Sequence, residues 1–299
     1  MSPSNRYLRL TQLGQRAYAL SRLQRALRLF EAAEEEARNH GDRELADRAF
    51  CNRCVVLVEL DRLDGAVSQL KHVLMRSSDP FTSWMAAYYT AQAFEMEQNI
   101  GRALAYARRA SQLAAASGVP KALAASANQH GVLALKDSHF AEAAERFEEA
   151  LTLDGESDAP DPLATAVTRD NLGYCLMCVG RTDEGLTLCR DAAAALEATG
   201  NRHLLPEAYQ DLCYGELQQG RLDVAAVFGE KALALAREFN LEAIERNTLM
   251  LLADAAMDAG RDDEADDYLE RLAEHYPDLR GMKSFLQAFN VREVINLKV

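Results

Sequence analysis

The chain has 299 residues, of which 48% are hydrophobic and 26% are charged, and its formal net charge is −13. This acidic balance excludes nonspecific binding to nucleic acid or to anionic membranes, because both require a cationic surface. No stretch of 18 apolar residues occurs, and Met1 to Leu20 is too rich in arginine for a signal peptide. We therefore expect a cytoplasmic protein without a membrane span.

Small residues recur along the chain at a nearly fixed period. The position that we call the anchor holds Ala26, Ala66, Ala103, Ala143, Gly185, Ala225 and Ala265, at successive separations of 40, 37, 40, 42, 40 and 40 residues. A second small residue stands twelve positions before each anchor: Gly14, Cys54, Ala91, Gly131, Gly173, Cys213 and Ala253. Antiparallel helices joined by a short turn approach closely only where small side chains face each other. The recurrence predicts seven helix pairs.

Turn residues divide these predicted pairs in chain order. The first pair covers about residues 6–41, the second 43–78 and the third 81–118, and the fourth ends at residue 153. The longest connection, residues 154–162, contains four acids but lacks the spacing of a calcium loop, which favours a solvated acidic loop. The last three pairs end near residues 200, 240 and 277.

The spacing and the residue set resemble the tetratricopeptide repeat family, and the last three repeats carry the resemblance best. Their matching positions are Leu172, Gly173, Gly180 and Gly185; Tyr209, Leu212, Gly220 and Ala225; and Leu252, Gly260, Ala265 and Pro277. The period near 40 exceeds the family's ~34 residues, which indicates longer helices. The resemblance implies an all-α, right-handed superhelical solenoid over residues 1–281, with a partner bound on the concave surface that the first helices form.

The charge is unevenly distributed along the chain. Residues 1–30 contain six arginines and no acid: Arg6, Arg9, Arg16, Arg22, Arg25 and Arg28. One interpretation is a solvated face that pairs with nearby glutamates such as Glu34. The other is a contact surface for an acidic partner, including the acidic far end of a second copy.

The cysteines do not indicate a metal or redox centre. Cys51 and Cys54 form one C-x-x-C motif, and Cys175 and Cys178 form another. Both motifs fall inside predicted helices, without the turn that zinc ribbons use to surround the metal. We interpret the cysteines as small buried hydrophobic residues, and we expect no metal and no cofactor.

Amide and phenol side chains line one stripe of the predicted first helices, at positions 11, 14 and 15 before the anchor. With two acids of the same stripe, they form the predicted partner-binding set: Asn52, Tyr88, Tyr89, Gln92, Asn128, Gln129, Asp170, Asn171, Tyr174, Gln210, Asp211 and Tyr214. Amides both donate and accept hydrogen bonds, and tyrosines add apolar area, so the stripe indicates a peptide groove. An ordinary hydrated polar face is the alternative. Acids including Glu207 and Asp254 bias the C-terminal half toward a basic segment.

Within the family, a groove that grips acidic chaperone tails uses lysines and arginines, and this stripe has no lysine. The resemblance is closer to signalling members such as bacterial peptide-pheromone receptors and adaptor arrays. We find no nucleophile or acid/base constellation typical of an enzyme. The sequence therefore favours a noncatalytic adaptor or regulator that binds a protein or peptide segment, and the alternative is a homo-oligomeric scaffold that uses the basic first repeat and the tail.

Residues 282–299 fall outside the repeat. Residues 284–289 are predicted to form a capping helix, and residues 291–299 have strand-like alternation. The apolar residues have three destinations: the seventh repeat, a partner's sheet edge, or the groove of a second copy. The basic residues of this region, which include Lys298, suit an acidic groove.

Overall fold

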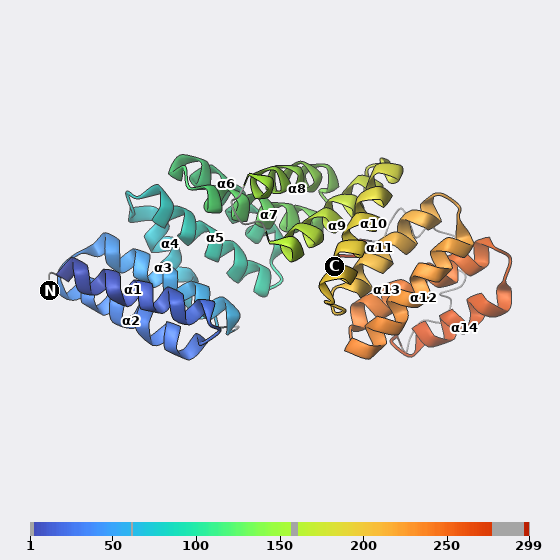
Figure 1. Ribbon diagram of the computed structural model, residues 1–299, viewed down its shortest axis with the longest axis horizontal. Helices are drawn as coiled ribbons and strands as arrows, with labels where there is room; N and C mark the ends of the chain where they lie inside the picture. The colour runs from blue at the N-terminus through green and yellow to red at the C-terminus, as the bar shows by residue number, and fades with distance from the viewer. Residues whose placement is uncertain (1–2, 61, 157–160, 277–295, 299) are drawn as a thin grey trace. The chain divides into compact units, whose positions relative to one another are not determined.

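The computed structural model describes residues 3–60, 62–156, 161–276 and 296–298, and in this part all regular secondary structure is helical, with no strand. This confirms the predicted all-α class. The chain divides into two compact units, Met1–Leu133 and Ala134–Val299, which we describe separately (Figure 1). None of the described helices is long and apolar enough to cross a bilayer.

The described helices alternate between the first and second members of seven pairs. They are α1 Pro3–Ala19, α2 Leu23–Asn39, α3 Arg43–Glu59, the 3-10 turn η1 Asp64–Ala66, α4 Val67–Arg76, α5 Pro80–Met96, α6 Ile100–Ser117, α7 Pro120–Lys136, α8 Phe140–Gly155, α9 Pro162–Cys178, α10 Thr182–Thr199, α11 Leu205–Gln218, α12 Leu222–Phe239, α13 Glu242–Asp258 and α14 Asp262–Ala273.

Small residues set how closely the two helices of a pair approach, as the repeat predicts. In the pair α9 and α10, a Cβ atom on Gly173 would lie 2.7 Å from the carbonyl oxygen of Gly185 and 2.5 Å from Cys189 Sγ. All seven anchor residues are buried. Each first helix of the second unit also packs on the next one, α9 on α11 and α11 on α13. The first helices therefore form a continuous layer from which a site can be built.

The turn within each pair requires a residue in the left-handed region. Three late repeats place glycine there: Gly180, Gly220 and Gly260, with φ of 85°, 67° and 69°. Three early repeats place other residues at the equivalent position: Ser21, Gln98 and Ser138, with φ of 53°, 57° and 59°. Because a Cβ atom is disfavoured at positive φ, the early turns are strained where the late turns are not.

The predicted capping helix lies outside the described residues, as does most of the predicted strand-like segment. Residues Asn296 to Lys298 are described, and they lie in the second unit against its first helices (Figure 1).

Candidate functional site

The predicted partner-binding residues all lie on first helices, but they differ in exposure. In α3, α5 and α7, Asn128 is exposed, Gln129 and Tyr89 are buried, and the others are half-buried: Asn52, Tyr88 and Gln92. In α9 and α11, Asn171 is half-buried and the others are buried: Asp170, Tyr174, Gln210, Asp211 and Tyr214. The two halves of the predicted stripe are thus differently accessible.

Two of the amides are engaged inside the array. Gln129 Nε2 donates to the carbonyl oxygen of Tyr88 on the preceding first helix, at 3.1 Å. Gln210 Nε2 donates to the carbonyl oxygen of Ile244 and to Thr248 Oγ1 on the next first helix, both at 3.1 Å. These amide groups tie neighbouring repeats together by capping backbone or hydroxyl acceptors that burial would otherwise leave unsatisfied.

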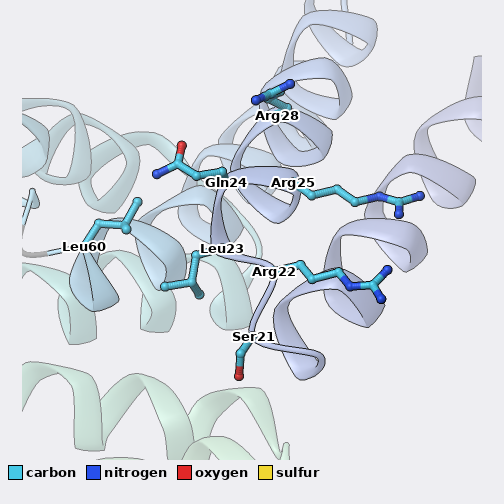
Figure 2. Close-up of a pocket in the computed structure, with 7 residues that line it drawn as sticks. All are labelled: Ser21, Arg22, Leu23, Gln24, Arg25, Arg28 and Leu60. Atoms are coloured by element: carbon cyan, nitrogen blue, oxygen red, sulfur yellow. The ribbon is translucent and has the colours of Figure 1, made fainter.

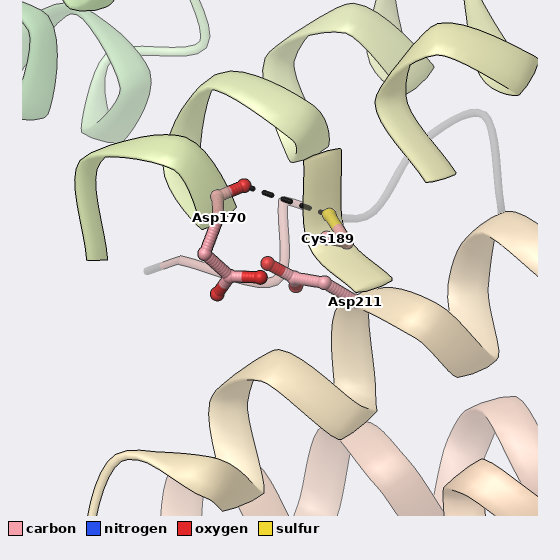
Figure 3. Close-up of side chains that lie close together, drawn as sticks. All are labelled: Asp170, Cys189 and Asp211. Carbon is pink, nitrogen blue, oxygen red and sulfur yellow. Dashed lines mark hydrogen bonds between the residues drawn. The ribbon is translucent and has the colours of Figure 1, made fainter. Parts of the chain in front are cut away.

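An acidic cluster lies where α9 and α11 face each other. Asp170 on α9 is 5% exposed and Asp211 on α11 is fully buried, and Figure 3 shows their carboxylates side by side. Glu207, one helical turn before Asp211, is half-buried. Cys189 of α10 lies beside them, and its Sγ donates to the backbone carbonyl of Asp170 at 3.7 Å (Figure 3). Burying carboxylates in this way is costly unless a cation accompanies them.

That cation is the ammonium group of Lys298. Its Nζ lies 2.6 Å from Asp211 Oδ2, donates to Glu207 Oε1 at 2.7 Å, and lies 3.9 Å from Asp170 Oδ2. It also stands 5.3 Å from the centre of the Tyr174 ring, within cation–π range. The lysine side chain is only 4% exposed. We refer to the four residues around it, Asp170, Tyr174, Glu207 and Asp211, as the ammonium site.

Lys298 and the two residues before it are held by polar bonds to four successive first helices. Asn296 Nδ2 donates to the carbonyl oxygen of Leu135 at the end of α7, at 2.8 Å. The Leu297 amide donates to Tyr174 Oη on α9 at 3.0 Å, and Asn247 Nδ2 on α13 donates to the Leu297 carbonyl at 3.2 Å. With Lys298 bound on α11, the segment Asn296–Lys298 spans the first helices of the unit as a bound peptide would.

The charges in the ammonium site depend on one another. Burial raises the pKa of Asp170 to about 6, although the charge of Lys298 opposes the rise, and burial likewise raises the pKa of Asp211. The charge of Lys298 lowers the pKa of Glu207. Burial alone would lower the pKa of Lys298, but the three carboxylates together raise it well above its usual range. The lysine is therefore charged, and acids outnumber it.

Asp170, Cys189 and Asp211 have ligand types that also suit a divalent metal, and their candidate atoms lie within 4.8 Å of one another. The arrangement fits an ammonium group better. Burial raises the pKa of the Cys189 thiol well above its usual range, so the thiol keeps its proton and donates a hydrogen bond to a backbone carbonyl. Asp211, the deepest acid, is already paired with Lys298.

Part of this site lies outside the predicted partner-binding set. Asn247 and Glu207 both stand 18 positions before their anchors, Ala265 and Ala225, one helical turn beyond the stripe that defined the predicted set. Extending the stripe by that turn would have found Asn247. The sequence identified the acidic character of this half and the suitability of Lys298, but not the first helices on which the lysine lies.

A second polar feature belongs to the first unit. Arg22, Arg25 and Arg28 line an open pocket at the start of α2, together with Leu60 from the end of α3 (Figure 2). All three arginines are exposed, and within the described residues none forms an ion pair. Glu34, one of the acids expected to pair with them, binds Arg38 and Arg53 instead. The pocket is thus a cationic surface with unused charge.

No protein-family model matches the sequence, and no curated protein does. Solved structures match its fold. The apo form of the quorum sensor NprR from B. thuringiensis superposes with a TM-score of 0.69 at 13% identity, over 96% of this chain and 79% of that chain. NprR bound to its cognate peptide NprX gives 0.64 at 13% identity, over 96% and 82%. A Rap protein complexed with competence and sporulation factor gives 0.66 at 12% identity, over 91% and 76%.

Identities this low establish the fold and nothing further. The similar solved structures, the small residues that face each other within a pair, and the repeated left-handed turn agree with one another. The chain is an all-α solenoid of tetratricopeptide-like helix pairs.

Proposed function

We propose that this chain is a noncatalytic adaptor or regulator that binds a peptide segment of a partner protein across the first helices of its second unit. The observation that carries the proposal is the segment Asn296–Lys298, which is bound there through its backbone and one buried ammonium group. Similar folds include NprR in complex with its cognate peptide NprX and a Rap protein complexed with competence and sporulation factor.

The chemistry of the ammonium site favours a basic partner. Three carboxylates surround one position, and a lysine or arginine there gains charge-assisted hydrogen bonds that a neutral side chain lacks. The bonds with Tyr174 and Asn247 involve backbone atoms of Leu297, so they hold a peptide backbone without demanding a particular side chain. Specificity would then come mainly from the basic residue and from its apolar neighbour.

A peptide-binding experiment tests this function. A random peptide library is selected on the full chain with Lys298→Gln, which removes the competing ammonium group, and the affinities of selected peptides are measured by fluorescence polarisation. We expect enrichment of peptides with a basic residue next to an apolar one. Adding Asp211→Asn should weaken their binding at least about tenfold, the effect of losing one buried charge-assisted bond.

The matched control is Asp191→Asn, the same substitution at an exposed position of α10 in the same unit. It should leave binding unchanged. If no peptide is enriched, or if the enriched peptides bind the Asp211→Asn chain equally well, the second unit is not the peptide-binding surface.

The alternative function is a self-assembling scaffold, and the cationic pocket favours it. Unpaired Arg22, Arg25 and Arg28 of one copy would face the acidic α14 of another, whose first turn contains three acids. Such a head-to-tail contact extends into filaments unless its rotation closes a ring. Sedimentation velocity at low salt would show association that Arg22→Ser with Arg25→Ser abolishes; a monomer at every concentration and ionic strength argues against the scaffold.

A further inference from the structure

We infer that the segment Asn296–Lys298 is a releasable internal ligand, which closes the peptide site until a partner segment with an apolar residue followed by a basic one displaces it. The inference rests on the proposed function and adds two statements to it: the site regulates itself, and its occupant shows the kind of peptide that the partner presents.

The contacts of the segment are those of an exchangeable peptide. Only two side chains enter the site, Leu297 at 5% exposure and Lys298 at 4%. The bonds to first helices otherwise join their side chains to the Leu297 backbone, or the Asn296 side-chain amide to the Leu135 carbonyl of α7. The same Asn296 amide donates to Ser138 Oγ, just after α7. Any peptide offers the amide and carbonyl groups that Leu297 uses, and the turn that presents them is supported by the Lys298 amide, which donates to Asn296 Oδ1 at 3.0 Å. A partner segment therefore needs to match the apolar and basic positions and this turn.

The internal ligand leaves part of the site unused. Lys298 Nζ is 3.9 Å from Asp170 Oδ2, which is beyond hydrogen-bond distance. Asp170 Oδ1 and Asp211 Oδ1 are buried and accept no hydrogen bond from the described residues. Three carboxylates therefore face one ammonium group with acceptors to spare. A guanidinium group has five donors in a planar fork and would reach more of them, so a partner with arginine at this position has an advantage over Lys298.

Tethering explains how a moderate ligand keeps the site closed. Because the segment belongs to the same chain as the site, it competes at an effective concentration, which for covalently linked ligands is on the order of 1 mM. At that concentration, a segment with an intrinsic dissociation constant of about 100 μM occupies its site roughly nine-tenths of the time. A partner with better contacts then opens the site, at an apparent affinity about tenfold weaker than its intrinsic one.

The test compares three forms of the full chain: wild type, Lys298→Gln, and Lys121→Gln as a matched substitution at an exposed lysine of the first unit. The probe is the fluorescein-labelled, C-terminally amidated peptide Val-Ile-Asn-Leu-Lys-Val. We expect it to bind the Lys298→Gln chain about tenfold more tightly than wild type or Lys121→Gln. The same peptide with glutamine in place of its lysine should bind none of them, and the peptide with arginine there should bind more tightly than the lysine peptide.

A second measurement needs no variant, so it remains decisive if Lys298→Gln fails to fold. Hydrogen–deuterium exchange of wild type reports the Leu297 amide, which donates to Tyr174 Oη. Saturating arginine peptide should accelerate exchange of the fragment that contains this amide and leave α12 fragments unchanged. Unchanged exchange at saturation, or equal probe affinity for wild type and a folded Lys298→Gln chain, would overturn the inference. If library peptides still required Asp211, the proposed function would survive that outcome, and the segment would be a fixed part of the fold.

Discussion

Substituting Gly173 by alanine tests whether the contact between α9 and α10 sets the geometry of the second unit. The new Cβ would lie 2.7 Å from a backbone oxygen on Gly185 and 2.5 Å from Cys189 Sγ, where ordinary contacts begin near 3.4 Å. Backbone oxygen cannot rotate away, so the two helices must separate. Overpacking of this kind typically destabilises a protein by about 1–3 kcal/mol and occasionally by more. The higher helix propensity of alanine offsets about 1 kcal/mol of this cost.

We therefore expect Gly173→Ala to lower the free energy of unfolding by about 2 kcal/mol, which corresponds to about 4–8 °C in melting temperature for a unit of this size. Circular dichroism measures the melting temperature of the whole chain. The single tryptophan, Trp84, lies in the first unit and should report a smaller change in midpoint. Because α9 also carries Asp170 and Tyr174, the substitution should weaken peptide binding at the ammonium site.

The control is Gly155→Ala, in the last turn of α8, where an added Cβ meets no atom within 4 Å. This substitution should be neutral or stabilising by about 0.5–1 kcal/mol. If Gly173→Ala melted at or above the wild-type temperature, the close approach of small residues would not be what positions these helices.

Three further predictions concern the turns, the thiols and the tryptophan. Gln98→Gly should raise stability by about 0.5–1 kcal/mol by relieving a left-handed turn, while Gly180→Ala should lower it by about 1 kcal/mol, both measured by urea unfolding; equal midpoints would contradict the strain argument. Burial raises the pKa of all six cysteine thiols, that of Cys178 to about 11. In the native protein at pH 8, Ellman's reagent should therefore react slowly and only with the half-buried Cys178, whereas guanidinium should expose all six thiols. Rapid reaction of several native thiols would contradict the predicted burial. Ser126→Ala removes the acceptor of the Trp84 indole N–H at 2.7 Å and should cost about 1–2 kcal/mol, measured from tryptophan emission during urea unfolding; an unchanged midpoint would show that the indole finds another partner.

The sequence predicted the fold well because one physical requirement recurs seven times. Close helix approach needs small residues at two positions twelve residues apart, and their recurrence with a period near 40 indicates an array of helix pairs. The turn was only partly predictable. Gly180 and Gly220 indicate a left-handed residue, whereas Gln98 and Ser138 occupy the same conformation without any signal in their side chains. The packed helices on either side hold these residues in the strained conformation, which their local preferences disfavour.

The site was less predictable than the fold, because offsets along a repeat identify the face of a helix on which a residue lies but not the contacts that its side chain makes. Gln210 and Asp211 are adjacent on α11, yet the first bonds the next helix and the second binds Lys298. The acidic bias was visible in the sequence because acidic residues can be counted without knowing where their side chains lie. The docked position of Lys298 was not, because the repeat pattern does not say which of the chain's surfaces a residue outside the repeat binds. What selects the ammonium site among them is the cost of leaving its buried carboxylates without a cation. The same cost makes any partner that displaces the segment supply a positive charge of its own.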